Sequence, residues 1–106
     1  MKTFTINISV VSGTIVCDAG GGNVRGHYDD KVAWQSALPF SLRFALQTGK
    51  GEQNWPFQGS PAPPTDKKNF DGKLNLVDPN NPPAYKYTVL IDGYPPLDPI
   101  IIVDRT

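Results

Sequence analysis

The 106-residue sequence has one cysteine, one histidine and one methionine, and it lacks a long apolar run. A single Cys17 excludes an internal disulfide, and because small secreted domains are usually rich in disulfides, a cytoplasmic location is slightly favoured. No signal peptide is evident, since polar residues interrupt the apolar ones near the N-terminus. No run is long enough for a membrane span. These absences leave the location open but remove disulfide scaffolds and membrane anchors from the expected classes.

The chain also lacks an excess of charge of either sign. Ten acidic residues balance ten basic ones, and the densest basic stretch, Lys67–Lys68 with Lys73, is interrupted by Asp66 and Asp71. A nucleic-acid-binding protein normally carries a basic stripe. We therefore expect no nucleic-acid partner.

Proline and glycine are plentiful, and their distribution points to turns between strands. The 11 prolines and 10 glycines show no period, which is typical of an all-β protein with many turns. A chain of this length forms one domain, here residues 1–106. The stretch 47–70 is rich in both residues and is expected to be a long loop.

Apolar residues alternate with polar ones in several segments. The period of two, with β-branched residues, predicts half-buried strands. The expected strands cover residues 3–10, 14–17, 32–34, 40–46, 73–77, 84–91 and 99–103. The expected core consists of Phe4, Ile6, Ile8, Val32, Trp34, Phe40, Leu42, Phe44, Tyr87, Val89, Ile100 and Ile102.

The C-terminal segment has a recognisable pattern. Tyr85-Lys86-Tyr87-Thr88-Val89 leads through a turn at 92–96 to a final apolar strand. This pattern, together with the Val32-x-Trp34 strand, resembles the C-terminal hairpin of cupredoxin-like domains and is similar to small uncharacterised bacterial proteins of this shape. The resemblance implies an all-β Greek-key β-sandwich of about seven strands, cupredoxin-like or immunoglobulin-like.

The copper ligands of that fold are missing. In the resemblance, Val89 stands where the copper-binding cysteine would lie, and Pro39 or Phe40 stands near the position of a histidine ligand. A blue-copper site needs two histidines and a cysteine. We expect no copper site and no other cofactor.

The segment His27-Tyr28-Asp29-Asp30 is the only local group of ligand-type side chains. It could hold Zn²⁺ or Ca²⁺ weakly, although a solvated turn is the expectation. Cys17 could act as a nucleophile only with His27 as its base, but its apolar neighbours predict a buried, inert thiol. The glycine-rich segment 20–26 is expected to connect strands. An enzyme is therefore not the expected class.

Trp55-Pro56-Phe57 places two large aromatic side chains inside the expected loop. Either they fold back and close one end of the domain, which is the default, or they stand exposed and anchor a partner together with Tyr94.

These observations leave three hypotheses for function. The first is a non-catalytic binding module for an unknown protein or small ligand, using Trp55, Phe57 and Tyr94. The second is a self-assembling protein that pairs through strand edges, with Ile100–Val103 as the apolar strand concerned. The expected state in solution is a monomer or a homodimer. The third is a small enzyme or metal protein centred on His27.

Overall fold

The computed structural model describes residues 2–48, 55–75 and 84–104, which form seven strands and one short helical turn. The all-β expectation is thus confirmed. The elements are β1 (Thr3–Val11), β2 (Thr14–Cys17), α1 (Asp18–Gly21), β3 (Val24–His27), β4 (Lys31–Thr48), β5 (Lys67–Lys73), β6 (Ala84–Leu90) and β7 (Ile100–Asp104). No helix among these residues is long and apolar enough to cross a membrane.

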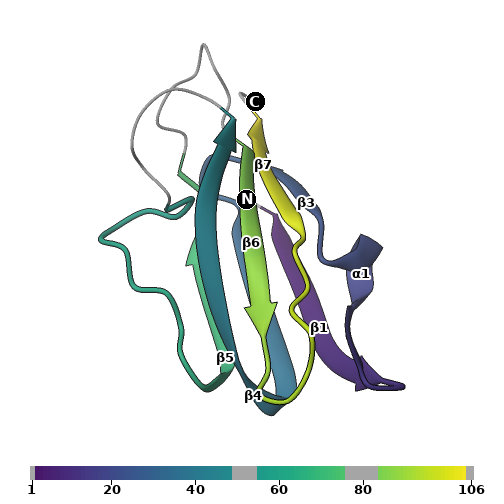
Figure 1. Ribbon diagram of the computed structural model, residues 1–106. Coiled ribbons are helices and arrows are strands. Elements are labelled where there is room, and N and C mark those ends of the chain that lie inside the picture. The colour runs from purple at the N-terminus through teal and green to yellow at the C-terminus, as the bar shows by residue number, and fades with distance from the viewer. Residues whose placement is uncertain (1, 49–54, 76–83, 105–106) are drawn as a thin grey trace.

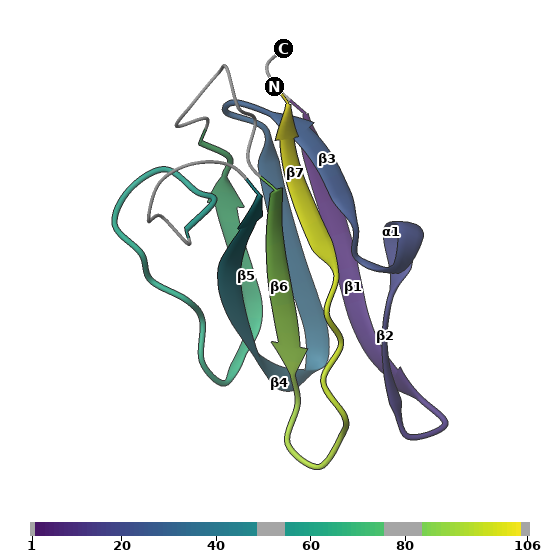
Figure 2. The ribbon, with the colours of Figure 1, turned by 45° about the horizontal axis from the view of Figure 1, so that its top comes forward.

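The strands form one curled, mixed sheet in the order β2-β1-β4-β6-β7-β3, with β5 also paired to β4. The 18-residue β4 makes this possible because its first part pairs with β1 and β5 and its second part with β6. The pairs β1–β4 and β3–β7 are parallel, and the other strand pairs are antiparallel. The sheet bends around its own inner face as a half-barrel (Figures 1 and 2).

β4 joins what the sequence predicts as two strands, over 32–34 and 40–46. The pairing with β5 shifts register between Gln35 and Phe40, so Pro39 lies where the ladder is interrupted. At that point the ladder does not need the backbone N–H donor that proline lacks. The bulge lets a single strand pass through a proline.

Two other expected elements are placed differently. The fifth strand covers Lys67–Lys73 rather than 73–77, and Leu76 and Val77 lie outside the described residues. β3 was expected only as part of a glycine-rich connection; its parallel pairing with β7 is a long-range contact that local composition does not encode.

The core is built around Trp34. Its ring lies 5.4–6.2 Å, centroid to centroid, from four other aromatic rings, and its Nε1 donates a hydrogen bond to Tyr87 Oη at 3.3 Å. The expected core residues that are buried are Ile6, Ile8, Val32, Trp34, Phe40, Leu42, Tyr87 and Val89. Phe4 and Phe44 are partly buried and pack against this core.

The expectation is wrong for the last strand. Ile101 and Val103 are fully buried, whereas Ile100 and Ile102 are only half-buried on the outer face. An unbroken apolar run carries no alternation, and a shift of one residue exchanges the two faces. The register, which pairs Ile101 with Tyr85, determines the face. β7 lies between β6 and β3, so it is not an edge strand.

Trp55 and Phe57 close one end of the core, which confirms the default expectation. Trp55 is 8% exposed and Phe57 is 2% exposed. Phe57 forms a bridge with Leu74, and its ring lies directly over Gly72, where a Cβ atom would come within 2.7 Å of the ring. The absence of a side chain at Gly72 of β5 therefore makes room for the Phe57 ring.

Candidate functional site

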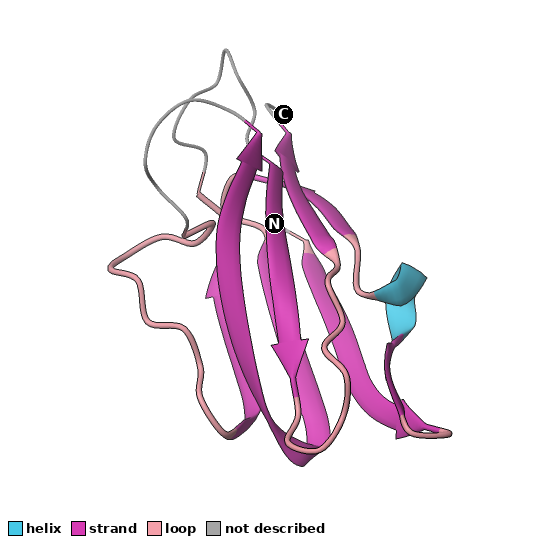
Figure 3. Cartoon of the chain, in the orientation of Figure 1, coloured by secondary structure: helices cyan, strands magenta, loops and turns pink. Residues whose placement is uncertain are grey.

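Residues 59–66, here called the arch, bow away from β5 before the chain enters that strand (Figures 1 and 3). One end is fixed where Gln58 N donates to Lys73 O at 2.8 Å. The other is fixed where Leu42 N donates to Pro64 O at 3.1 Å and Asp66 N to Ser41 Oγ at 3.1 Å. The arch is thus held at both ends by backbone hydrogen bonds.

Arg43 gives the arch a third attachment. Its guanidinium donates to Leu42 O at 2.8 Å, to Pro64 O at 3.2 Å and to Thr65 Oγ1 at 3.3 Å. The Arg43 side chain is exposed, and it also binds the proline-rich segment. Three contacts from one planar group orient the end of the arch against β4.

Between the arch and the sheet lies an open pocket of about 730 Å³, here called the arch pocket. It is lined by residues 33–35 of β4, 62–65 of the arch, and 67 and 69–71 of β5. Polar groups come from Gln35, Thr65, Lys67, Asn69 and Asp71, and apolar walls come from prolines and the partly buried Phe70. Such a mixture is typical of a ligand site with a few hydrogen-bonding groups on an apolar surface.

A chain of three polar side chains crosses the outer face of the sheet and ends at this pocket. The Asp18 carboxylate accepts hydrogen bonds from Asn7 N and Asn7 Nδ2, both at 2.7 Å. Asn7 Oδ1 then accepts from Gln35 Nε2 at 2.6 Å. The hydrogen bonds from the Asn7 backbone and side chain hold the pKa of Asp18 below its usual value. Asp18 is therefore a carboxylate, which only accepts hydrogen bonds, at neutral pH.

Two charges of opposite sign lie in the pocket wall. The Asp71 carboxylate is 3.1 Å from Lys31 Nζ, and Lys67 contributes an ammonium group. An exposed pair of this kind adds little stability. Because Lys31 pairs with Asp71, Lys67 is the remaining charge among the residues that line the pocket.

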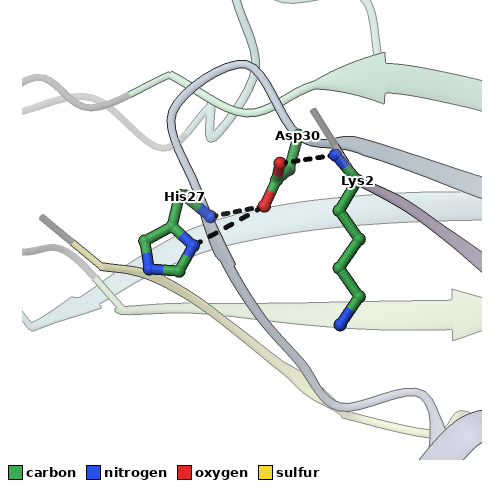
Figure 4. A network of polar contacts seen from close by, with 3 residues as sticks. All are labelled: Lys2, His27 and Asp30. Carbon is green, nitrogen blue, oxygen red and sulfur yellow. Dashed lines mark hydrogen bonds and ion pairs between the residues drawn. The ribbon is translucent and has the colours of Figure 1, made fainter. Parts of the chain in front are cut away.

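His27 and Asp30 lie elsewhere, in the turn between β3 and β4 (Figure 4). The buried carboxylate of Asp30 accepts hydrogen bonds from His27 N at 3.0 Å and Lys2 N at 2.8 Å, and His27 Nδ1 is 3.7 Å away. These hydrogen bonds, that of His27 first, hold the pKa of Asp30 below its usual value. Asp30 therefore joins the start of β1 to the β3–β4 turn.

Asp29 points to a different partner. Its carboxylate accepts from Gln58 Nε2 at 3.0 Å, which connects the turn to the start of the arch. Within the described ranges, no three side chains of histidine, cysteine, aspartate or glutamate lie close enough to hold a metal ion. The segment His27–Asp30 therefore has the geometry of a hydrogen-bonded turn.

Cys17 lies at the end of β2 with its side chain in the core, 5% exposed. Burial, with a contribution from the adjacent Asp18 charge, raises the pKa of the Cys17 thiol to about 11. Burial likewise raises the pKa of Tyr87, whose hydroxyl donates to Gly22 O. Both groups are protonated at neutral pH and make internal contacts.

Of the three residues considered as anchors for a partner, Trp55 and Phe57 are buried and Tyr94 is exposed. Trp55 and Phe57 pack in the aromatic cluster, 5.2 Å apart between ring centroids, and do not offer a surface. The buried Nε1 atom of Trp55 has no hydrogen-bond partner among the described residues. Tyr94, in the turn after β6, remains 37% exposed.

The chain matches no protein-family model, no curated protein and no solved structure to which it was compared. The arch pocket therefore has to be interpreted from its own chemistry. The arch pocket has no local signature in the sequence, because Gln35 and Asn69 are 34 residues apart and form no motif. Their side chains lie on the outer face of two paired strands. The sequence gives one partial indication: Gln35 follows the core residue Trp34, so alternation along this strand turns the Gln35 side chain away from the core.

Proposed function

We propose that this protein is a non-catalytic binding module and that its ligand occupies the arch pocket. The observation that carries the proposal is a pocket of about 730 Å³ whose wall is held in place from three elements: β4, β5 and the arch fixed by Arg43. A preformed pocket reduces the conformational entropy that binding would otherwise cost. Trp55 and Phe57 do not serve as anchors in this proposal, because both rings are buried in the core.

The chemistry of the titratable groups supports binding rather than catalysis. A nucleophile needs an adjacent base or a lowered pKa. The pKa of Cys17 is instead raised to about 11. His27 and Asp30 are not among the residues that line the pocket, and the Asp30 carboxylate is occupied by two backbone N–H groups.

The finer fold assignment belongs to the same proposal. We propose a cupredoxin-like Greek-key sandwich without copper ligands, and two observations support it. β4 is shared by two groups of strands, one of β1, β2 and β5 and the other of β3, β6 and β7. Val89, which the resemblance sets at the position of the family's cysteine, is buried. The test is a titration of the protein with Cu²⁺ and Cu⁺: stoichiometric binding that needs Cys17 and His27 would contradict this assignment.

The binding proposal is tested by mapping where small molecules collect on the ¹⁵N-labelled protein. A library of chemically diverse fragments, including alcohols, amides, carboxylates, amines and aromatic compounds, is added and amide shifts are recorded. We expect the largest amide shifts at residues 33–35, 62, 65, 67 and 69–71, since Pro63 and Pro64 have no amide hydrogen. Fragments that collect instead around Tyr94, or that shift no residue of the arch pocket, would overturn the proposal.

A pair of alanines on β4 supplies matched variants. Ala33 lines the pocket and Ala45 is exposed on the same strand outside it. Ala33→Phe fills the pocket and should abolish the fragment shifts, whereas Ala45→Phe should preserve them. Equal effects from both substitutions would mean that the shifts do not report on the pocket.

A further inference from the structure

We infer that the arch pocket takes a neutral ligand rich in hydroxyl groups, a short oligosaccharide, and that Gln35 receives it with a carbonyl oxygen whose direction is set by Asp18 through Asn7. The inference rests on the proposed binding function and adds the class of ligand. It depends on the order of donors and acceptors along the polar chain described above.

Asp18 determines which way the hydrogen bonds run along the three polar side chains Asp18, Asn7 and Gln35. An ionised carboxylate has no hydrogen to donate, so any amide group that contacts it must turn its NH₂ toward it. Asn7 contacts Asp18 through both its backbone N and its Nδ2, at 2.7 Å each. The opposite orientation of the Asn7 amide would set its oxygen against the carboxylate. The Asn7 amide is therefore held in one orientation.

The same logic passes to the next residue. With its NH₂ directed to Asp18, Asn7 presents Oδ1 to β4, and Gln35 must offer Nε2 to it, as the 2.6 Å contact shows. This leaves the Gln35 side-chain oxygen, Oε1, outside the contact with Asn7. Gln35 lines the arch pocket and pairs with Asn69 of β5 in the sheet, so we assign this oxygen as the acceptor that Gln35 offers to a ligand there.

The other polar groups of the pocket complement this acceptor. The Asn69 amide offers both a donor and an acceptor, and the Thr65 hydroxyl can donate while it accepts from Arg43. The Asp71 carboxylate is paired with Lys31, which leaves Lys67 as a single cation among the lining residues. A phosphate or another anion would favour a cluster of arginine and lysine. A lining with one lysine and no arginine instead favours a neutral ligand.

Hydroxyl groups match this wall because each one donates one hydrogen bond and accepts others. Carboxamide and carboxylate side chains spaced along a strand suit neighbouring hydroxyls on a sugar ring. The apolar faces of such a ring would lie against Pro63 and Phe70, which also line the pocket. The pocket volume of about 730 Å³ accommodates a ligand larger than a monosaccharide.

The first experiment titrates the ¹⁵N-labelled protein with four probes: maltotriose, cellotriose, N,N′,N″-triacetylchitotriose and a neutral hexapeptide of serine and glycine. We expect at least one trisaccharide to shift the side-chain amide signals of Gln35 and Asn69 in a saturable manner, and the peptide to leave them unchanged. If the peptide alone produces the shifts, the saccharide inference is overturned while the binding function stands. If no probe shifts these signals and the fragments collect elsewhere, both fail.

Two variants test the role of Gln35, and their affinities are measured with the trisaccharide that binds. Gln35→Leu removes the acceptor and should weaken binding by about tenfold, the cost of one hydrogen bond that also leaves a polar group unmatched. Thr5→Leu places the same side chain on the same outer face but outside the pocket and should leave the affinity unchanged. An unchanged affinity in Gln35→Leu would overturn the inference.

Asp18→Asn tests the direction of the polar chain without touching the pocket. An asparagine at position 18 can donate or accept, so Asn7 and Gln35 are no longer restricted to one orientation. We expect the Gln35 side-chain amide signals to move before ligand is added, and the affinity to fall by about threefold. If these signals keep their wild-type positions in a folded Asp18→Asn protein, Asp18 does not position Gln35.

Discussion

Asp30 shows how one buried carboxylate can serve the fold rather than a reaction. It accepts hydrogen bonds from the backbone of Lys2 and His27, and its own backbone O accepts from Leu74 N at 2.8 Å. The N-terminal strand, the β3–β4 turn and the segment after β5 therefore meet at one residue. Removing the charge should affect stability and its dependence on pH.

Asp30→Asn is expected to lower the free energy of unfolding at pH 7 by about 1–3 kcal/mol, because an amide NH₂ would face a backbone donor. Since the folded-state pKa of Asp30 is depressed, its contribution is complete above the unfolded-state pKa of about 4 and disappears as pH falls through the folded-state value. Urea unfolding followed by tryptophan fluorescence between pH 7 and pH 2 should show a weaker pH dependence in the variant. The exposed Asp92→Asn is the control, and a wild-type pH profile in Asp30→Asn would contradict the assigned role.

Cys17 should behave as a thiol of the core. With its pKa raised to about 11 and 5% exposure, it is expected to react with Ellman's reagent at pH 8 much more slowly than in urea-unfolded protein, by at least about 100-fold. The rate should increase with denaturant as the protein opens. Rapid labelling under native conditions would show an accessible, activated thiol and would restore the enzyme hypothesis that uses Cys17.

At the scale of elements, alternation predicts most of the strands and some of their faces. β1 and β6 follow their period-two pattern, and the bounds 14–17 agree with β2. The prediction is wrong where the pattern stops: at the proline inside β4, in the unbroken apolar run of β7, and in β3, whose Val24 and Gly26 pair with a strand about 77 residues later in the chain. Register and long-range pairing decide these positions, and local sequence does not contain them.

Gly22 is the point where α1, β6 and the segment before β7 approach one another. Its φ is +87°, and a Cβ atom there would lie 2.7 Å from Tyr87 Oη and 3.1 Å from both Cys17 Cβ and Pro99 Cγ. Gly93 has nearly the same φ, +88°, with open space around it. The two glycines separate the cost of backbone conformation from the cost of the close contact.

Gly93→Ala is therefore expected to lower the free energy of unfolding by about 1–2 kcal/mol, the cost of a left-handed backbone for a residue with a Cβ atom. Gly22→Ala should add the overlap with Tyr87 and exceed this by about 1–3 kcal/mol. Both values are obtained from urea unfolding at pH 7. Equal losses in the two variants would mean that the contact around Gly22 relaxes without cost.

At the scale of the whole molecule, the sequence indicates a β domain with a long loop but not the pocket that the loop encloses. The expectation that Trp55 and Phe57 close the core follows from their size and apolar character. The arch pocket, in contrast, depends on two hydrogen bonds from Arg43 to the arch and on the pairing that sets Gln35 beside Asn69. These are contacts between distant segments of ordinary residue types, and composition gives no sign of them.

The edges of the sheet determine whether copies of the molecule associate. Among the described strands, β2 and β3 end the sheet and β5 pairs only with β4. β5 also accepts a backbone hydrogen bond at its end, from Gln58 N to Lys73 O. It carries Lys67, Lys68 and Lys73, and lysines on an edge strand oppose pairing with another chain. We therefore expect these lysines to keep the β5 edge from pairing with a second copy of the protein.

Replacing Lys68 and Lys73 together by valine should expose an uncharged edge and produce dimers or larger species in sedimentation velocity runs. The control replaces Lys86 and Thr88 by valine on β6, which has strand neighbours on both sides, so apolar surface added away from an open edge should leave the protein monomeric. Because these substitutions also remove the contacts of both residues with Asp98, the fold of the control is checked by urea unfolding. High salt should increase association of the wild type slightly, because it screens repulsion between lysines. Monomeric Lys68→Val/Lys73→Val protein would show that the arch itself, and not the lysines, blocks this edge.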